Sequence, residues 1–73
     1  MASSCKQVKG KKSWPELVGA PGQTATSVIE SENQKVDAIV VEEGDFVSTD
    51  IRCDRVRVFV DANNVVKKVP KVG

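Results

Sequence analysis

One stretch of the chain decides the fold, residues 36–60, which reads VDAIVVEEGDFVSTDIRCDRVRVFV. It begins and ends with runs of β-branched residues, Val36–Val41 and Val56–Val60, and such runs are typical of buried strands. We expect two central neighbouring strands, the first of them covered on both faces. The segment between them, Gly44–Val56, is long and polar and ends in closely spaced arginines. A loop of this length in a small protein buries little, which indicates that something binds it.

Two arginines at the start of the second run bear on the shape of this loop. Arg55 and Arg57 are two residues apart, so they project from the same side of a strand. From that side their guanidinium groups can hydrogen-bond back to Ser48 and Asp50, and such groups hold carboxylates in fixed geometry. The spacing therefore predicts a loop that is stiffened from below and presented to a partner as a rigid ligand.

Residues 22–33 carry the pattern of one amphipathic helix. Three apolar residues recur there at helical spacing, namely Ala25, Val28 and Ile29. The preceding pair, Pro21 and Gly22, offers no side-chain oxygen to cap the first turn. We expect Asn33 to end the helix in a left-handed turn.

The residues before this helix predict a short helical turn that ends near Gly19. Ser13 and Glu16 have the spacing of a capping box, with Ser13 as the N-cap residue, and Pro15 suits the first turn. Trp14 is the only tryptophan of the chain, and we expect it to pack in the core.

The last part of the chain predicts a turn and a short third strand. Residues 61–64 read DANN, which is turn material between β-rich segments. We expect residues 65–66, together with Val69, to add a short edge strand that Pro70 closes. The predicted fold class is α+β, with a single amphipathic helix packed on a small mixed β-sheet and a long exposed loop.

Composition excludes several classes of function. The chain has 73 residues, which indicates one domain, and its formal net charge of +1 gives no field that steers it to nucleic acid or an anionic membrane. It has no histidine, so the commonest general base is missing, and two cysteines alone cannot form a structural zinc site. The longest apolar run, residues 38–41, is too short to span a bilayer. We expect no metal and no cofactor.

Residues 1–12 are polar and rich in lysine. We expect a solvated N-terminal arm that is tethered by Cys5, followed by one domain over residues 13–73. The first residues lack the apolar core of a signal peptide. The chain then either starts in the cytosol or is a mature secreted or vacuolar form with an added methionine, and the compartment stays open.

The two cysteines can form only one pair. A disulfide between Cys5 and Cys53 closes a ring worth about 4 kcal/mol of unfolding free energy in the chain-entropy model. The alternative is two free thiols in a cytosolic protein. We favour the disulfide, because one partner lies in a loop that needs rigidity.

Two other classes of function compete with a rigid binding loop. A nucleic-acid-binding module would use Arg52, Arg55 and Arg57 on phosphates, but interspersed acidic residues oppose that charge. A small redox or hydrolytic enzyme would need Cys53 as its nucleophile, and the sequence holds neither a CxxC pair nor a histidine partner.

Several segments together resemble the potato inhibitor I family of serine protease inhibitors, which includes barley chymotrypsin inhibitor and leech eglin. The segments are SWPELVG at 13–19, VSTD at 47–50 followed by Arg52, RVRVFVD at 55–61 and VPKVG at 69–73. The resemblance covers residues 13–73. The cysteine pair is similar to that of the disulfide-bearing plant members of squash, flax and amaranth seeds.

The resemblance implies a serine-type endopeptidase inhibitor and not an enzyme. It implies a reactive-site bond between Thr49 and Asp50, presented by a loop that the protease binds like a substrate. The other implied protease-contacting residues are Phe46, Val47, Ser48, Ile51 and Arg52. The implied loop-bracing residues are Arg55 and Arg57, and the implied disulfide joins Cys5 and Cys53.

Three positions depart from the family pattern. Ser48 replaces a usual threonine, and Pro21 stands where relatives often have a helix-capping serine. Thr49 is neither basic nor large and apolar at the specificity position. The implied partners are therefore subtilisin-like or elastase-like serine proteases, with weak inhibition of trypsin and chymotrypsin. We expect a monomer, with a role in plant defence and the response to wounding.

Overall fold

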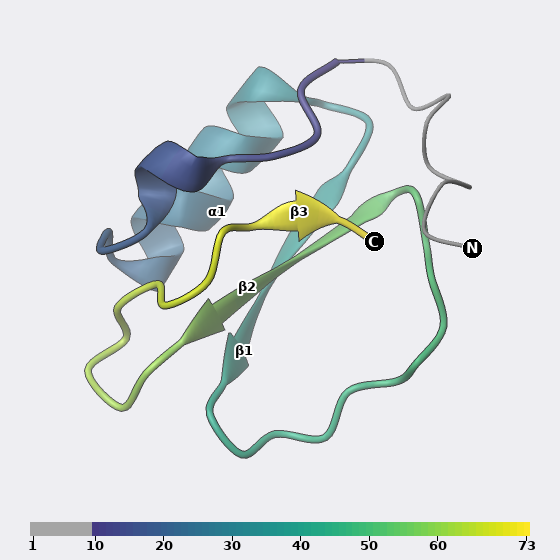
Figure 1. Ribbon diagram of the computed structural model, residues 1–73. Helices are drawn as coiled ribbons and strands as arrows, with labels where there is room; N and C mark the ends of the chain where they lie inside the picture. The colour runs from purple at the N-terminus through teal and green to yellow at the C-terminus, as the bar shows by residue number, and fades with distance from the viewer. Residues whose placement is uncertain (1–9) are drawn as a thin grey trace.

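The structure is a computed structural model that describes residues 10–73, and it has the α+β architecture expected from the sequence (Figure 1). One helix packs on a three-stranded mixed sheet. In chain order the elements are the 3₁₀ helix η2 (Pro15–Leu17), the helix α1 (Gly22–Glu32), and the strands β1 (Asp37–Glu42), β2 (Arg55–Val60) and β3 (Lys71–Val72).

The strand order of the sheet is β1-β2-β3, so β2 is the central strand. Strands β1 and β2 are parallel, from the pair Asp37 and Arg55 to the pair Glu42 and Val60. Strand β3 is antiparallel to β2. The prediction that the two β-branched runs lie side by side is confirmed. The prediction that both are central is wrong, because β1 lies at the edge of the described sheet. Because β1 and β2 run in the same direction, the connection between them must return along the whole length of the sheet.

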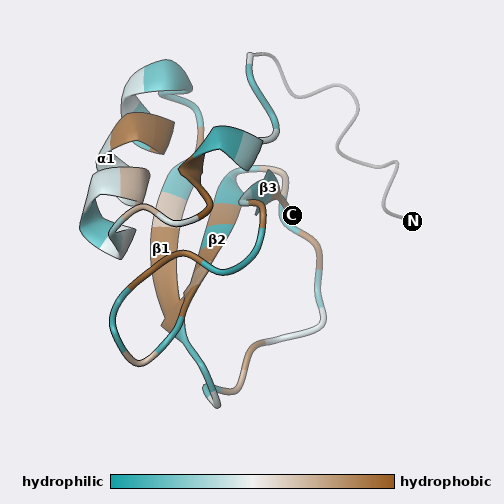
Figure 2. Ribbon diagram, turned by 60° about the vertical axis from the view of Figure 1, so that its left-hand side comes forward, coloured by the Kyte–Doolittle hydropathy of each residue, from teal (hydrophilic) through white to brown (hydrophobic). Residues whose placement is uncertain are grey.

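The core lies between α1 and one face of the sheet. Trp14 and Ile29 are fully buried there, and Figure 2 shows hydrophobic residues along β1 and β2. The prediction of a core tryptophan is confirmed. The prediction that β1 is covered on both faces is wrong, because Ala38 and Val40 pack against the core while Ile39 on the opposite face is 46% exposed.

Helix α1 begins without a side-chain cap, as its sequence predicts. Its first residue, Gly22, lies so close to the rest of the protein that an added Cβ would be 2.8 Å from Oδ1 of Asn64. That Cβ would also be 3.0 Å from Cγ1 of the buried Val60, so a larger residue at this position requires both neighbouring side chains to shift. The left-handed turn predicted at Asn33 is wrong, because that residue has φ −142°, and its side-chain Nδ2 donates to the carbonyl of Lys11.

The capping box predicted at Ser13 is also wrong, although the short helical turn itself is present. The N-cap position of η2 is Trp14, with no side-chain cap. Ser13 instead forms an isolated β-bridge with Lys71, and Glu16 pairs with Lys11. A bridge to a distant strand and an ion pair with a residue before the turn therefore replace the local cap.

The third strand is displaced from its predicted position. Residues 65–66 form only isolated bridges, with Pro21 and Val60, and the paired edge strand β3 follows Pro70. Val66 is nonetheless buried, with 1% exposure. Its β-branched character therefore serves core packing and not a strand ladder.

Candidate functional site

The candidate site is the connection between β1 and β2, residues 43–54, which we call the binding loop. A six-residue strand is about 20 Å long, and a chain joining two parallel strands must cover that distance in return. Figure 1 shows this connection bowing away from the sheet between the end of β1 and the start of β2. The parallel topology thus exposes the loop and leaves room for side chains of β2 beneath it.

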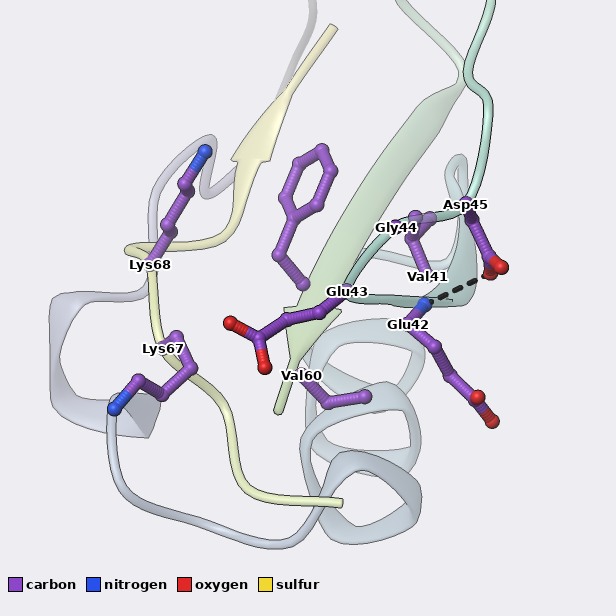
Figure 3. A pocket seen from close by; sticks show the side chains of 9 residues that line it. Val41, Glu42, Glu43, Gly44, Asp45, Val60, Lys67 and Lys68 are labelled. Carbon is purple, nitrogen blue, oxygen red and sulfur yellow. Dashed lines mark hydrogen bonds between the residues drawn. The ribbon is translucent and has the colours of Figure 1, made fainter. Parts of the chain in front are cut away.

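The upstream end of the binding loop is fixed by a tight turn. The amide of Asp45 donates to the carbonyl of Glu42 over 3.1 Å, and the carboxylate of Asp45 accepts from the amide of Glu42 over 3.0 Å (Figure 3). Gly44 adopts φ +88°, which a residue with a side chain rarely does. The loop therefore leaves β1 in a defined direction.

The middle of the binding loop exposes apolar side chains and unpaired main chain. Phe46 is fully exposed, and Val47 and Ile51 are 41% and 46% exposed. Within the described part of the chain, no main-chain hydrogen bond joins residues 46–51 to another main-chain group. The carbonyl of Asp50 accepts from an arginine side chain. An extended segment whose amides and carbonyls are not bonded to other main-chain groups can pair with the backbone of a partner.

Arg57 supports the upstream half of the loop from below. Its Nη2 donates to the hydroxyl of Ser48 over 2.7 Å and lies 3.7 Å from Oδ1 of Asp50. Its side chain is only 18% exposed, so these contacts are shielded from much of the solvent. The structure thus contains the contact that the two-residue spacing of the arginines predicts.

Arg55 holds the downstream half and links it to the end of the sheet. Its Nη2 donates to the carbonyl of Asp50 over 2.9 Å, and Nη1 is 3.5 Å from the carboxylate of the same residue. Its Nε donates to the carbonyl of Gly73 over 2.9 Å. The sequence predicts the contact with Asp50 but gives no signal for the one with Gly73, which depends on the position of β3.

Thr49 lies between the two supported residues and is exposed. On either side of it, Ser48 and Asp50 are held through their side chains by arginines. The tip of the loop therefore has a fixed backbone course while the Thr49 side chain is left accessible. This arrangement can present one side chain to a pocket of a partner.

Both bracing arginines, Arg55 and Arg57, approach the carboxylate of Asp50. The pKa of its carboxyl is lowered, first by the hydrogen bond with Ser48 and then by the charges of Arg55 and Arg57. Near neutral pH the carboxylate is ionised and binds both guanidinium groups. The arginines of β2 are thus engaged with the loop, which leaves them unsuited to a free phosphate-binding patch.

The downstream arm carries a further ion pair that the sequence reasoning missed. Arg52 contacts Asp54 through two hydrogen bonds, of 3.1 and 3.0 Å. The spacing of two residues is the only signal that could have indicated it. Cys53 lies between them, and its predicted partner Cys5 lies outside the described residues.

A pocket of about 320 Å³ lies beside the upstream turn. Figure 3 shows Lys67 and Lys68 on one side of it and Asp45 on the other, with Glu43 between. Nζ of Lys68 lies 4.9 Å from the centre of the Phe59 ring. Among residues 10–73, no three histidine, cysteine or acidic residues gather as metal ligands, and no helix is long and apolar enough to cross a membrane.

The fold and the loop define a class of small proteins that present an extended segment held from beneath by arginines. Comparisons with known proteins agree with this class. The model of the potato inhibitor I family matches residues 5–73, so the chain belongs to that family.

Individual relatives match over most of their length. The protease inhibitor HPI of Hevea brasiliensis is 52% identical over 73 residues, which is 100% of both chains. The Glu S.griseus protease inhibitor of Momordica charantia is 49% identical over 67 residues, 92% of this chain and 98% of that protein. The crystal structure of bitter gourd trypsin inhibitor superposes with a TM-score of 0.88 at 45% identity, covering 90% of this chain and 97% of that one.

Proposed function

We propose that the protein inhibits serine proteases by inserting the binding loop like a substrate, with the bond between Thr49 and Asp50 at the catalytic centre of the enzyme. Membership of the potato inhibitor I family gives the coarse class, a protease inhibitor and not an enzyme. The residues assigned to contact the protease are Phe46, Val47, Ser48, Thr49, Asp50, Ile51 and Arg52.

One observation carries the proposal: the loop is fixed by arginine side chains of β2, and its middle part is not bonded to other main-chain groups. Arg57 holds the side chain of Ser48 and Arg55 holds the carbonyl and carboxylate of Asp50. Within the described part of the chain, however, residues 46–51 form no hydrogen bond to another main-chain group. A protease binds an extended substrate largely through such main-chain groups, and side chains fill its pockets.

The arginines beneath the loop explain why the protease would be inhibited and would not simply hydrolyse the loop. A loop already held in its bound shape loses little conformational entropy on binding, which strengthens the complex. The same arginines oppose the distortion that hydrolysis requires. After cleavage, Arg55 would keep Asp50 in place through its carbonyl and carboxylate, so the new amine stays near the acyl group and the bond can re-form.

The target class follows from the side chain of Thr49. It carries no charge for the acidic pocket of trypsin and leaves the large apolar pocket of chymotrypsin mostly empty. Subtilisin-like and elastase-like enzymes accept small groups and are the proposed partners. Relatives of this chain bear names that refer to different proteases, among them trypsin and an S. griseus enzyme, which is consistent with a shared scaffold and a variable target.

The proposal includes three properties outside the loop tip. A disulfide between Cys5 and Cys53 would tie the N-terminal arm to the downstream arm of the loop. The protein would act as a monomer, since one loop suffices for one protease. A role in defence or wounding is supported by a 43% identical relative, the wound-induced proteinase inhibitor 1 of Solanum peruvianum.

The test is a set of inhibition constants against trypsin, chymotrypsin, subtilisin and elastase. Wild type should bind subtilisin or elastase best, and Thr49→Lys should strengthen trypsin inhibition by about a hundredfold, because it adds the charge that the pocket selects. Thr24→Lys, on the exposed surface of α1, adds the same charge away from the loop and should change nothing.

Two results would overturn this proposal. Wild type that inhibits trypsin best would show that Thr49 does not set the specificity. Equal trypsin inhibition by wild type and Thr49→Lys would show that the reactive bond lies elsewhere in the loop.

A further inference from the structure

We propose that Asp54 is a positioning residue that holds the side chain of Arg52 on the leaving side of the reactive bond. The inference rests on the proposed function, since Arg52 is the third residue after Thr49 in the proposed register. Asp54 has no assigned contact with the protease. It would act on inhibition through Arg52.

The geometry of the pair is bidentate. Nε of Arg52 donates to Oδ1 of Asp54 over 3.1 Å, and Nη2 donates to Oδ2 over 3.0 Å. Two parallel bonds fix the plane of a guanidinium as well as its position, which a single bond to an ammonium cannot do. The pair therefore restricts the direction of the Arg52 side chain.

Asp54 is suited to be the fixed member of the pair. Its carbonyl accepts from the amide of Asp37 over 2.8 Å, at the start of the ladder between β1 and β2. The next residue, Arg55, begins β2 and is buried. Asp54 is thus attached to the sheet, whereas Arg52 belongs to the projecting loop.

The pair complements the support given by Arg55. Arg55 holds Asp50 from beneath, and Asp54 holds Arg52 on the outer surface, where the two side chains are 56% and 54% exposed. Ile51 lies between these two fixed residues and is itself 46% exposed. The segment 50–52, on the leaving side of the reactive bond, is then held at both ends while the side chain of Ile51 stays available to the enzyme.

Asp54 also differs from the other acidic residues near Arg52 in how it interacts with the guanidinium group. The pKa of Asp54 is lowered, first by its hydrogen bond with Arg52. Asp50 and Asp37 also raise the pKa of Arg52, but only through their charges. Asp37 therefore offers a matched control, a carboxylate near Arg52 that forms no hydrogen bond with it.

The experiment measures inhibition constants and loop cleavage for Asp54→Asn, Arg52→Lys and Asp37→Asn against the protease that wild type inhibits best. Asp54→Asn should weaken inhibition about threefold, the scale of one exposed ion pair, and should speed cleavage of the loop. Arg52→Lys keeps the charge but loses the fork, so it should behave like Asp54→Asn. Asp37→Asn should match wild type.

A double-mutant cycle decides whether Asp54 acts through Arg52. In the Arg52→Ala background, Asp54→Asn should have no further effect. An equal effect of Asp54→Asn in both backgrounds would overturn the inference. So would an Asp37→Asn variant as impaired as Asp54→Asn, since charge alone would then be sufficient.

A measurement on the free protein separates this inference from the proposed function. The Nε–H order parameter of Arg52, measured by ¹⁵N relaxation, should fall in Asp54→Asn and stay at the wild-type value in Asp37→Asn. If wild type inhibits no protease, the proposed function fails while this result still tests the pair. An unchanged order parameter in Asp54→Asn would refute the positioning role directly.

Discussion

Two long connections flank the central strand β2, one before it and one after it, and they are held in place by different kinds of hydrogen bond. Residues 61–70 run from β2 to β3 and are fixed through their main chain. The amide of Val66 donates to the carbonyl of Ala20, and the carbonyl of Val66 accepts from the amide of Gly19, each over 2.9 Å. The amide of Lys67 donates to the carbonyl of Phe59, also over 2.9 Å. This connection is part of the folded body.

The binding loop, residues 43–54, is fixed at its two ends by main-chain bonds and between them by arginine side chains. Arg57 reaches Ser48, and Arg55 reaches Asp50. The side chains also differ from those of the other connection, because Phe46 is fully exposed while Val66 is 1% exposed. The loop therefore adds little to the core.

The difference shows how a small protein can be rigid and still available for binding. A segment that uses its amides and carbonyls within the fold cannot offer them to a partner, as in residues 61–70. A segment held by side chains keeps most of its main chain for the partner and loses little freedom when it binds. Changes in the two connections should therefore separate stability from inhibition.

The largest effect is expected from loss of the proposed disulfide, which joins the N-terminal arm to the binding loop. Cys5→Ser with Cys53→Ser should lower the unfolding free energy by about 4 kcal/mol, because the unfolded chain regains its freedom. Inhibition should weaken less than stability, since Arg55 and Arg57 remain. Denaturant unfolding and inhibition constants measure the two. Two alkylated cysteines in protein isolated under thiol-blocking, non-reducing conditions would contradict the pairing.

A second change affects the main-chain-bonded connection alone. Val66→Ala should lower the unfolding free energy by about 2 kcal/mol, because it leaves a cavity beneath residues 61–70. The inhibition constant at a temperature where the variant is folded should equal that of wild type. A parallel loss of inhibition would show that the two connections are mechanically coupled. Stability and inhibition would then not be assigned to separate connections.

Much of this contrast could be predicted from the sequence, and the errors in the caps and the third strand have one physical source. The helix, the strand pair and the arginine contacts follow from periodicity and spacing, which are local. The failures at Ser13, Asn33 and Val66 each involve a main-chain or side-chain contact with a distant segment, namely Lys71, Lys11 and Ala20. No local pattern encodes such contacts, so caps and edge strands were misplaced while the main elements were correct.

The supports of the binding loop should affect cleavage more than folding. Arg57→Ala removes a charge-assisted hydrogen bond to Ser48, so the loop should be hydrolysed about tenfold faster by the cognate protease. Arg55→Ala should act similarly on cleavage and also lower stability, since the Arg55 side chain is 9% exposed and holds Gly73 as well.

Lys67→Ala is the charge-matched control for both variants, because it removes one positive charge outside the loop. Cleavage is followed by mass spectrometry during incubation with the protease, and stability by thermal unfolding. Cleavage of Arg57→Ala at the wild-type rate would show that the loop does not depend on this support.

The smallest effect is expected from pH and concerns the charge beneath the loop tip. The pKa of Asp50 is lowered in the folded protein, first by Ser48 and then by Arg55 and Arg57. A lowered pKa means that the ionised carboxylate stabilises the folded loop above its ordinary pKa of about 4, and that this contribution is lost as the pH falls through the folded value. Carboxyl carbon shifts measured by NMR should give a lowered pKa in wild type and in Lys67→Ala. Arg57→Ala should move it up toward the ordinary value, because one of the two positive charges is removed. If the pKa of Asp50 is equal in wild type and Arg57→Ala, then Arg57 holds the loop through Ser48 alone. The carboxylate of Asp50 then interacts with Arg55 and not with Arg57.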